Sequence, residues 1–121
     1  MNDASWIADV SRPGVVSLQE SLHPNLAVLE QRVADACPGR TGEVIDAAIR
    51  GVLGLTHTKV ADLDPAESVV YDVAEQFVLD VHAVTDPQFA RLKDHFAEPE
   101  IVAMLFRMAL ADGLGKLEKV A

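Results

Sequence analysis

Arg107 is the one charged side chain within the apolar run Ile101–Ala111. An unpaired buried charge is costly, so an arginine in that setting needs a partner. One interpretation is a structural ion pair with Glu75, Asp72 or Asp112, or with a neighbouring subunit. The other is an anchor for an anionic substrate, because the guanidinium fork binds a carboxylate through two parallel hydrogen bonds. Structural ion pairs at interfaces are common, which favours the first interpretation.

A second group of polar residues, Tyr71, Asp72 and Glu75, falls within one turn of a predicted helix. Tyr71 and Glu75 are four residues apart and therefore share a face. Glu75 as a base and Tyr71 as a proton donor would suit acid/base catalysis. The competing interpretation is a solvated polar face on an amphipathic helix, and it is favoured because such faces are more common than active sites.

His57, His82 and His95 each fall at or near a predicted helix end, where an imidazole can interact with the final carbonyls. Catalysis by His82 is a further hypothesis. No two histidines have metal-site spacing, so neither a metal nor another cofactor is predicted. Cys37, the single cysteine, follows a predicted helix C-terminus. The helix dipole disfavours a thiolate there, which argues against a redox role for Cys37.

The elements that must position these residues are predicted to be helices. Hydrophobic residues recur at helical spacing, and capping signals divide the chain into about five helices, giving an all-α fold. The helices are predicted to begin near Pro24, after the N-cap Thr41, after Asp64, after Thr85 and at Glu98. Residues 1–22 are interpreted as an N-terminal arm and residues 23–121 as a single helical domain.

Local signals also set expectations for individual helix ends. The segments Asp64-Pro65-Ala66-Glu67 and Thr85-Asp86-Pro87-Gln88 each have the cap, proline and third-residue acceptor of a capping box. The helix after Asp64 is expected to end around Asp80–His82. Gly113 and Gly115 are expected to bend or break the last helix, because glycine weakens a helix interior.

Composition narrows the class of protein. The chain has 121 residues, with 19 acidic and 10 basic side chains and a formal net charge of −9. This balance argues against nucleic acid or an anionic membrane surface as a main partner, because both attract clusters of Lys and Arg. The first ten residues lack the pattern of a secretory signal. We therefore expect a cytoplasmic protein.

The motifs from Asp64 onward resemble the carboxymuconolactone decarboxylase and AhpD-like family. They are Asp64-Pro65-x-Glu67, an apolar helix, His82-Ala83-Val84-Thr85-Asp86-x-x-Phe89-x-x-Leu92-x-x-x-Phe96, Glu100-Ile101-Val102 and an apolar helix ending in glycine. His23-Pro24-x-Leu26-x-x-Leu29-x-x-Arg32-Val33-Ala34 is a weaker upstream match. The resemblance implies a compact AhpD-like bundle that assembles as a trimer or hexamer.

The chain departs from the family pattern at the redox motif. AhpD-like enzymes carry a Cys-x-x-Cys pair that cycles through a disulfide, whereas this chain has Cys37 alone. We therefore expect a non-redox binding or structural subunit that assembles with itself or with a related subunit. The first alternative is a cofactor-free acid/base enzyme, similar to a lactone decarboxylase, in which Arg107 holds a small anionic substrate and Glu75, Tyr71 or His82 moves the proton. The second is a single-thiol peroxide reductase acting through Cys37.

Overall fold

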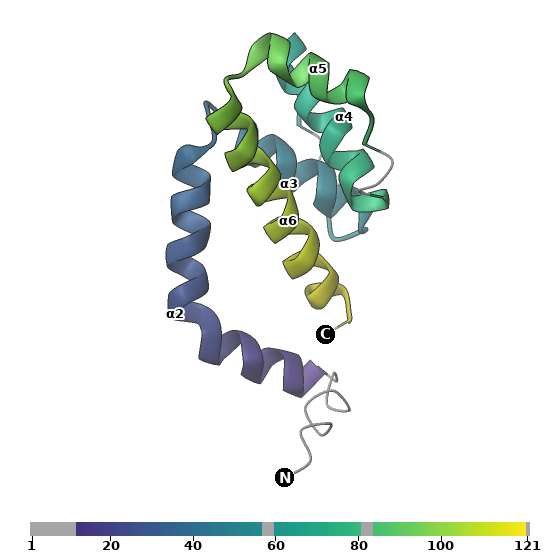
Figure 1. The fold of residues 1–121 in the computed structure, drawn as a ribbon. Helices are drawn as coiled ribbons and strands as arrows, with labels where there is room; N and C mark the ends of the chain where they lie inside the picture. The colour runs from purple at the N-terminus through teal and green to yellow at the C-terminus, as the bar shows by residue number, and fades with distance from the viewer. Residues whose placement is uncertain (1–11, 57–59, 81–83, 121) are drawn as a thin grey trace.

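The predicted all-α architecture of about five helices is confirmed for the part of the chain that the structure describes. The structure is a computed structural model that describes residues 12–56, 60–80 and 84–120, with the backbone alone for 12–23. Within these ranges the helices are α2 (Arg12–Ala36), α3 (Thr41–Val52), α4 (Pro65–Leu79), α5 (Asp86–His95) and α6 (Glu98–Val120). In Figure 1, α3 to α6 form the body of the bundle and α2 lies along one side of it.

The predicted start of the first helix at Pro24 is wrong, because α2 begins at Arg12 and holds Pro24 in its interior. Proline is favoured in a first turn, but an interior proline is also possible where the helix kinks. Figure 1 shows such a bend along α2. From Pro24 onward, most side chains of α2 are exposed, and Val33 is its buried residue. The division of the chain into an arm and a domain at residue 22 stays a prediction.

The start of α3 differs by one residue from the prediction. Arg40 is the N-cap residue and makes no side-chain cap hydrogen bond, whereas Thr41 is already helical. The Thr41 hydroxyl donates to the Pro38 carbonyl at 2.7 Å instead of accepting from the helix. Thr41 therefore stabilises the turn that precedes α3, and the prediction that it caps the helix is wrong.

Both predicted capping boxes are confirmed. The Asp64 carboxylate accepts from the Glu67 N–H at 2.7 Å, and Glu67 accepts from the Asp64 N–H at 3.0 Å. Thr85 and Gln88 make the equivalent reciprocal pair at the start of α5. α4 ends at Leu79, just before the predicted range.

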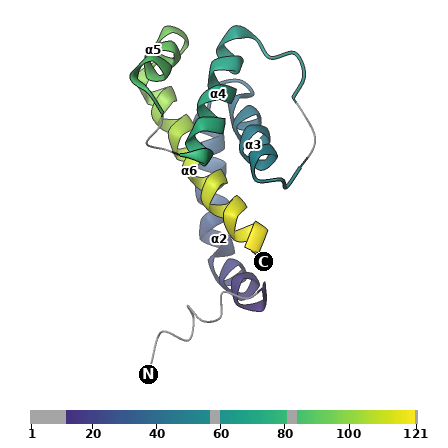
Figure 2. The ribbon, with the colours of Figure 1, turned by 90° about the vertical axis from the view of Figure 1, so that its right-hand side faces the viewer.

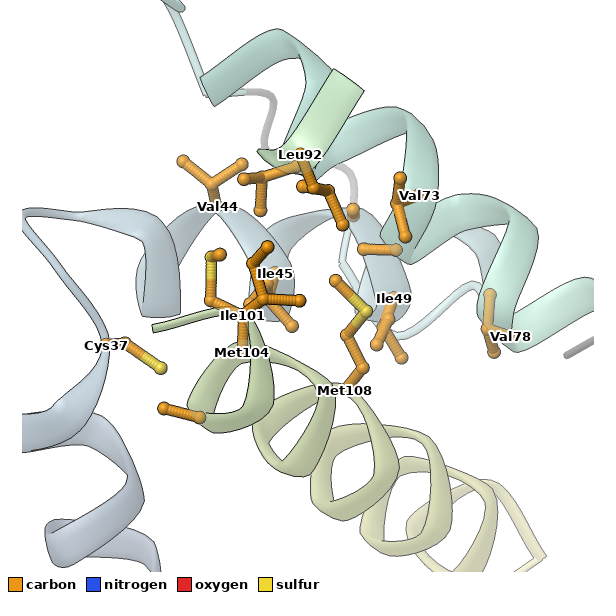
Figure 3. Packing of buried hydrophobic residues seen from close by; sticks show 14 of the residues in the cluster. Cys37, Val44, Ile45, Ile49, Val73, Val78, Leu92, Ile101, Met104 and Met108 are labelled. Carbon is orange, nitrogen blue, oxygen red and sulfur yellow. The ribbon is translucent and has the colours of Figure 1, made fainter. Parts of the chain in front are cut away.

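α3, α4 and α6 each supply four of the buried apolar side chains, and α5 adds Leu92 (Figure 3). The largest fully buried side chains are Ile45, Ile49, Leu92, Met104, Met108, Val44, Val70 and Val73. α6 continues to Val120, so the predicted break at Gly113 and Gly115 is wrong. A Cβ at Gly115 would lie 2.7 Å from Leu53 Cδ1, which shows that this glycine allows α6 to approach the end of α3 closely.

Candidate functional site

Arg107 forms a bidentate ion pair with Asp46 of α3. Arg107 Nε donates to Asp46 Oδ1 at 3.0 Å, and Arg107 Nη2 donates to Asp46 Oδ2. The two side chains are 17% and 32% exposed, so the pair is partly shielded from water. The predicted partners Glu75, Asp72 and Asp112 are therefore wrong.

A second ion pair follows the same seam between α3 and α6. Arg50 donates to the two carboxylate oxygens of Glu118 at 2.8 and 3.3 Å. Lys119 then donates to the Leu53 carbonyl at the end of α3. Along α3 the acidic Asp46 precedes the basic Arg50, whereas along α6 the basic Arg107 precedes the acidic Glu118. Sliding one helix along the other would therefore separate both pairs. The charges thus favour one parallel register of α3 and α6.

Cys37 lies at the end of α2 with its side chain directed towards α6 beside Met104 (Figure 3). Its side chain is buried. Burial raises the pKa of the Cys37 thiol, while the nearby Arg107 lowers it and Asp46 raises it. Because the two charges of the ion pair act in opposite directions, desolvation dominates and the protonated thiol is favoured. The site is therefore poor at generating the thiolate that peroxide reduction requires.

Glu75 and Tyr71 lie on α4, and both are partly buried. Burial raises the pKa of the Glu75 carboxyl, and the negative charge of Asp72 raises it further. Tyr71 packs against the hydrophobic core. Arg107 is committed to Asp46, so the structure does not join Glu75 and Arg107 in an ion pair.

Of the three histidines at or near predicted helix ends, His95 lies within the described residues. His82 and His57 lie outside the described residues. His95 is exposed at the end of α5, where its ring lies beside Phe96 with the centroids 6.3 Å apart. The role of His82 stays a prediction.

The sequence reasoning missed an ion pair between Arg40 and Glu67. Arg40 Nε and Nη2 donate to the Glu67 carboxylate at 2.6 and 2.9 Å, and Nη2 also donates to the Asp62 carbonyl at 2.8 Å. Asp62 has a φ of +58°, a conformation that aspartate tolerates better than most residues. The hydrogen bond from Arg40, followed by that from the Asp64 backbone, lowers the pKa of Glu67 to about 2. The capping box marked Glu67 in the sequence, but no local pattern linked it to Arg40.

Within residues 12–56, 60–80 and 84–120, no cluster of three or more His, Cys, Asp or Glu side chains could hold a metal ion. None of the helices in these ranges combines the length and apolar character needed to cross a membrane.

Comparisons with protein-family models, with curated proteins and with solved structures each gave no significant match. The resemblance to the AhpD-like family therefore depends on the ordered sequence motifs and stays a prediction. The structure independently establishes an all-α bundle with five helices in its described part.

Proposed function

We propose that this chain is a non-redox helical subunit that functions through assembly, as a binding or structural component. The observation that carries the proposal is the set of large apolar side chains on the surface of the single chain. These are Val28, Leu29, Leu79, Val102, Phe106 and Val120, each at least 44% exposed. Three of them, Val102, Phe106 and Val120, lie on α6. Exposed apolar side chains that gather on one surface are typical of interfaces.

The geometry of the polar residues supports the same proposal. Arg107 already binds a carboxylate of its own chain, so an incoming anion would have to displace Asp46. Burial keeps Cys37 protonated, which removes the nucleophile from a peroxide-reducing cycle. The Arg107 guanidinium and the Cys37 thiol are thus both held in structural environments.

Sedimentation velocity of the full chain at micromolar concentration tests the proposal. We expect a mass corresponding to more than one 13.0 kDa chain, and the family resemblance favours a trimer or a hexamer. A monomer across the micromolar range, in the absence of any other subunit, would overturn self-assembly. Copurification from the native source would then detect the related subunit that the alternative form of the proposal requires.

The environment of Glu75 favours acid/base catalysis as a second candidate function. A carboxyl group with a raised pKa, one turn from a tyrosine, has properties suited to proton transfer. Carboxymuconolactone is the probe that the family resemblance indicates. Release of carbon dioxide by the wild-type chain, lost in Glu75→Gln and kept in Asp72→Asn, would support this function. No release by the wild-type chain would reject decarboxylation of this substrate.

A further inference from the structure

The outward face of α6 carries a regular series of exposed residues, which we name the outer stripe. It consists of Val102, Phe106, Ala109, Gly113, Lys116 and Val120, all exposed. Their spacings alternate between four and three residues, which is the spacing of the contact positions of a coiled coil. The core residues Met104 and Met108 occupy a different face of the same helix. α6 is thus apolar towards the core and again along this outer stripe.

The outer stripe is symmetric about Ala111. Val102 and Val120 are equally far from Ala111 along the chain, as are Phe106 and Lys116, and Ala109 and Gly113. Two antiparallel copies of α6 centred on Ala111 would therefore place each stripe residue opposite its counterpart. A twofold interface requires this reciprocity, in which residue i contacts residue j and residue j contacts residue i.

The resulting pairs are chemically compatible. Val102 would meet Val120, with their exposed fractions of 51% and 59% reduced by the contact. Phe106, 59% exposed, would meet Lys116, whose stem can pack on the ring while its ammonium group lies over the ring or at its edge. Lys116 also pairs with Asp112 of its own helix at 2.9 Å. No like-charged residues of the stripe face each other.

Gly113 provides a second observation. A Cβ at Gly113 would meet no atom within 4 Å, so the single chain gives no packing reason for glycine there. Gly115, by contrast, makes room for Leu53. Glycine inside a helix is destabilising relative to alanine, and it commonly marks a close approach. Opposite Ala109 of a second copy, Gly113 would place the two smallest side chains at the centre of the contact.

Charge complementarity also favours an antiparallel second copy. Glu98 and Glu100 lie in the first turn of α6, whereas Lys116 and Lys119 lie towards its C-terminus, where Glu118 is neutralised by Arg50 of α3. Antiparallel pairing brings the acidic end of one helix towards the basic end of the other, and it opposes the two helix dipoles. Figure 1 shows α6 running between α2 and the pair α3 and α4, and both views show it extending away from α5 (Figure 2).

We propose that α6 pairs with α6 of a second copy of this chain, antiparallel, around a twofold axis at Ala111. The proposal rests on self-assembly as the proposed function and names the surface that mediates it. A twofold contact occurs in a dimer and in a hexamer with dihedral symmetry, and it is absent from a simple trimer. The outer stripe therefore implies an even number of subunits.

Disulfide trapping tests the pairing and its direction. Ala109→Cys and Gly113→Cys chains, with different mass tags, are mixed and oxidised mildly with copper phenanthroline. We expect a mixed disulfide between the two variants and at least tenfold less of either homodimeric disulfide. Wild-type chain is the control, because its single thiol, Cys37, is buried. Equal trapping of each variant alone would indicate parallel pairing and overturn the proposal.

Phe106→Glu provides an independent measurement that does not depend on new cysteines. We expect it to reduce the subunit number by half, while Ala90→Glu, at an exposed site on α5 outside both the outer stripe and the apolar set named above, leaves the number unchanged. Circular dichroism checks that both variants stay helical. If the wild-type chain assembles and Phe106→Glu assembles equally well, the α6 pairing is wrong and the proposed function stands. A monomeric wild-type chain overturns both.

Discussion

Arg107 of α6 and Asp46 of α3 form a bidentate ion pair that joins two of the helices that line the buried core. The pair is partly buried, so each charge depends on the other for compensation. Both charges of the pair act on the pKa of the buried Cys37 thiol, which directly follows the end of α2. An apparent substrate anchor is thus part of the contact between helices.

Removing either member of this pair should destabilise the fold. We expect Asp46→Ala and Arg107→Met each to lower the free energy of unfolding by about 1–3 kcal/mol, because each leaves a partly buried charge without its partner. The double variant should lose less than the sum of the two. Chemical denaturation of the four chains measures this coupling, and strictly additive losses would show that the pair contributes nothing.

Acid should weaken the fold through Glu67. The pKa of Glu67 is lowered from 4.5 to about 2 in the folded chain, so the folded state holds its proton less tightly than the unfolded state does. Its contribution to stability is complete above pH 4.5 and is lost as the pH falls towards about 2. Denaturant titrations between pH 6 and 2 should show a smaller dependence on pH in Glu67→Gln, and an unchanged slope would contradict the prediction.

A larger residue at Gly115 should disturb the packing of α6 on the end of α3. We expect Gly115→Val to cost about 1–3 kcal/mol, because a Cβ added at this position would lie 2.7 Å from Leu53 Cδ1. Gly51→Val is the matched control, since a Cβ at Gly51 meets no atom within 4 Å. Leu53→Ala should recover part of the loss in the double variant. Equal thermal stability of the two valine variants would count against the predicted clash.

Cys37 should react slowly in the folded chain. Burial shields the thiol and raises its pKa, so both access and the thiolate fraction are reduced. Alkylation by iodoacetamide should be at least tenfold slower than in the urea-unfolded chain, and the rate should rise only at a pH above that for a free cysteine. Peroxide consumption should be the same for wild type and Cys37→Ser. A fast native reaction would revive the single-thiol alternative.

The sequence by itself determined the helical class and the sharpest helix starts. The capping boxes at Asp64–Glu67 and Thr85–Gln88 are contacts between residues three apart, so a sequence pattern contains all the participants. The stripe of Val44, Ile45, Ala48 and Ile49 likewise predicts its own buried face. These interactions do not depend on how the helices are arranged.

The tertiary structure decided which residues meet across the bundle. Asp46 lies far from Arg107 in the chain, and Arg40 lies far from Glu67, so each pairing depends on the rotation and register of packed helices. The continuity of α6 through Gly115 has the same origin, because packing against Leu53 offsets the low helix propensity of glycine. Long-range contacts follow from the packing of the core, which no single segment specifies. This packing places Asp46 against Arg107, so the arginine that the sequence offered as a substrate anchor pairs with a carboxylate of its own chain.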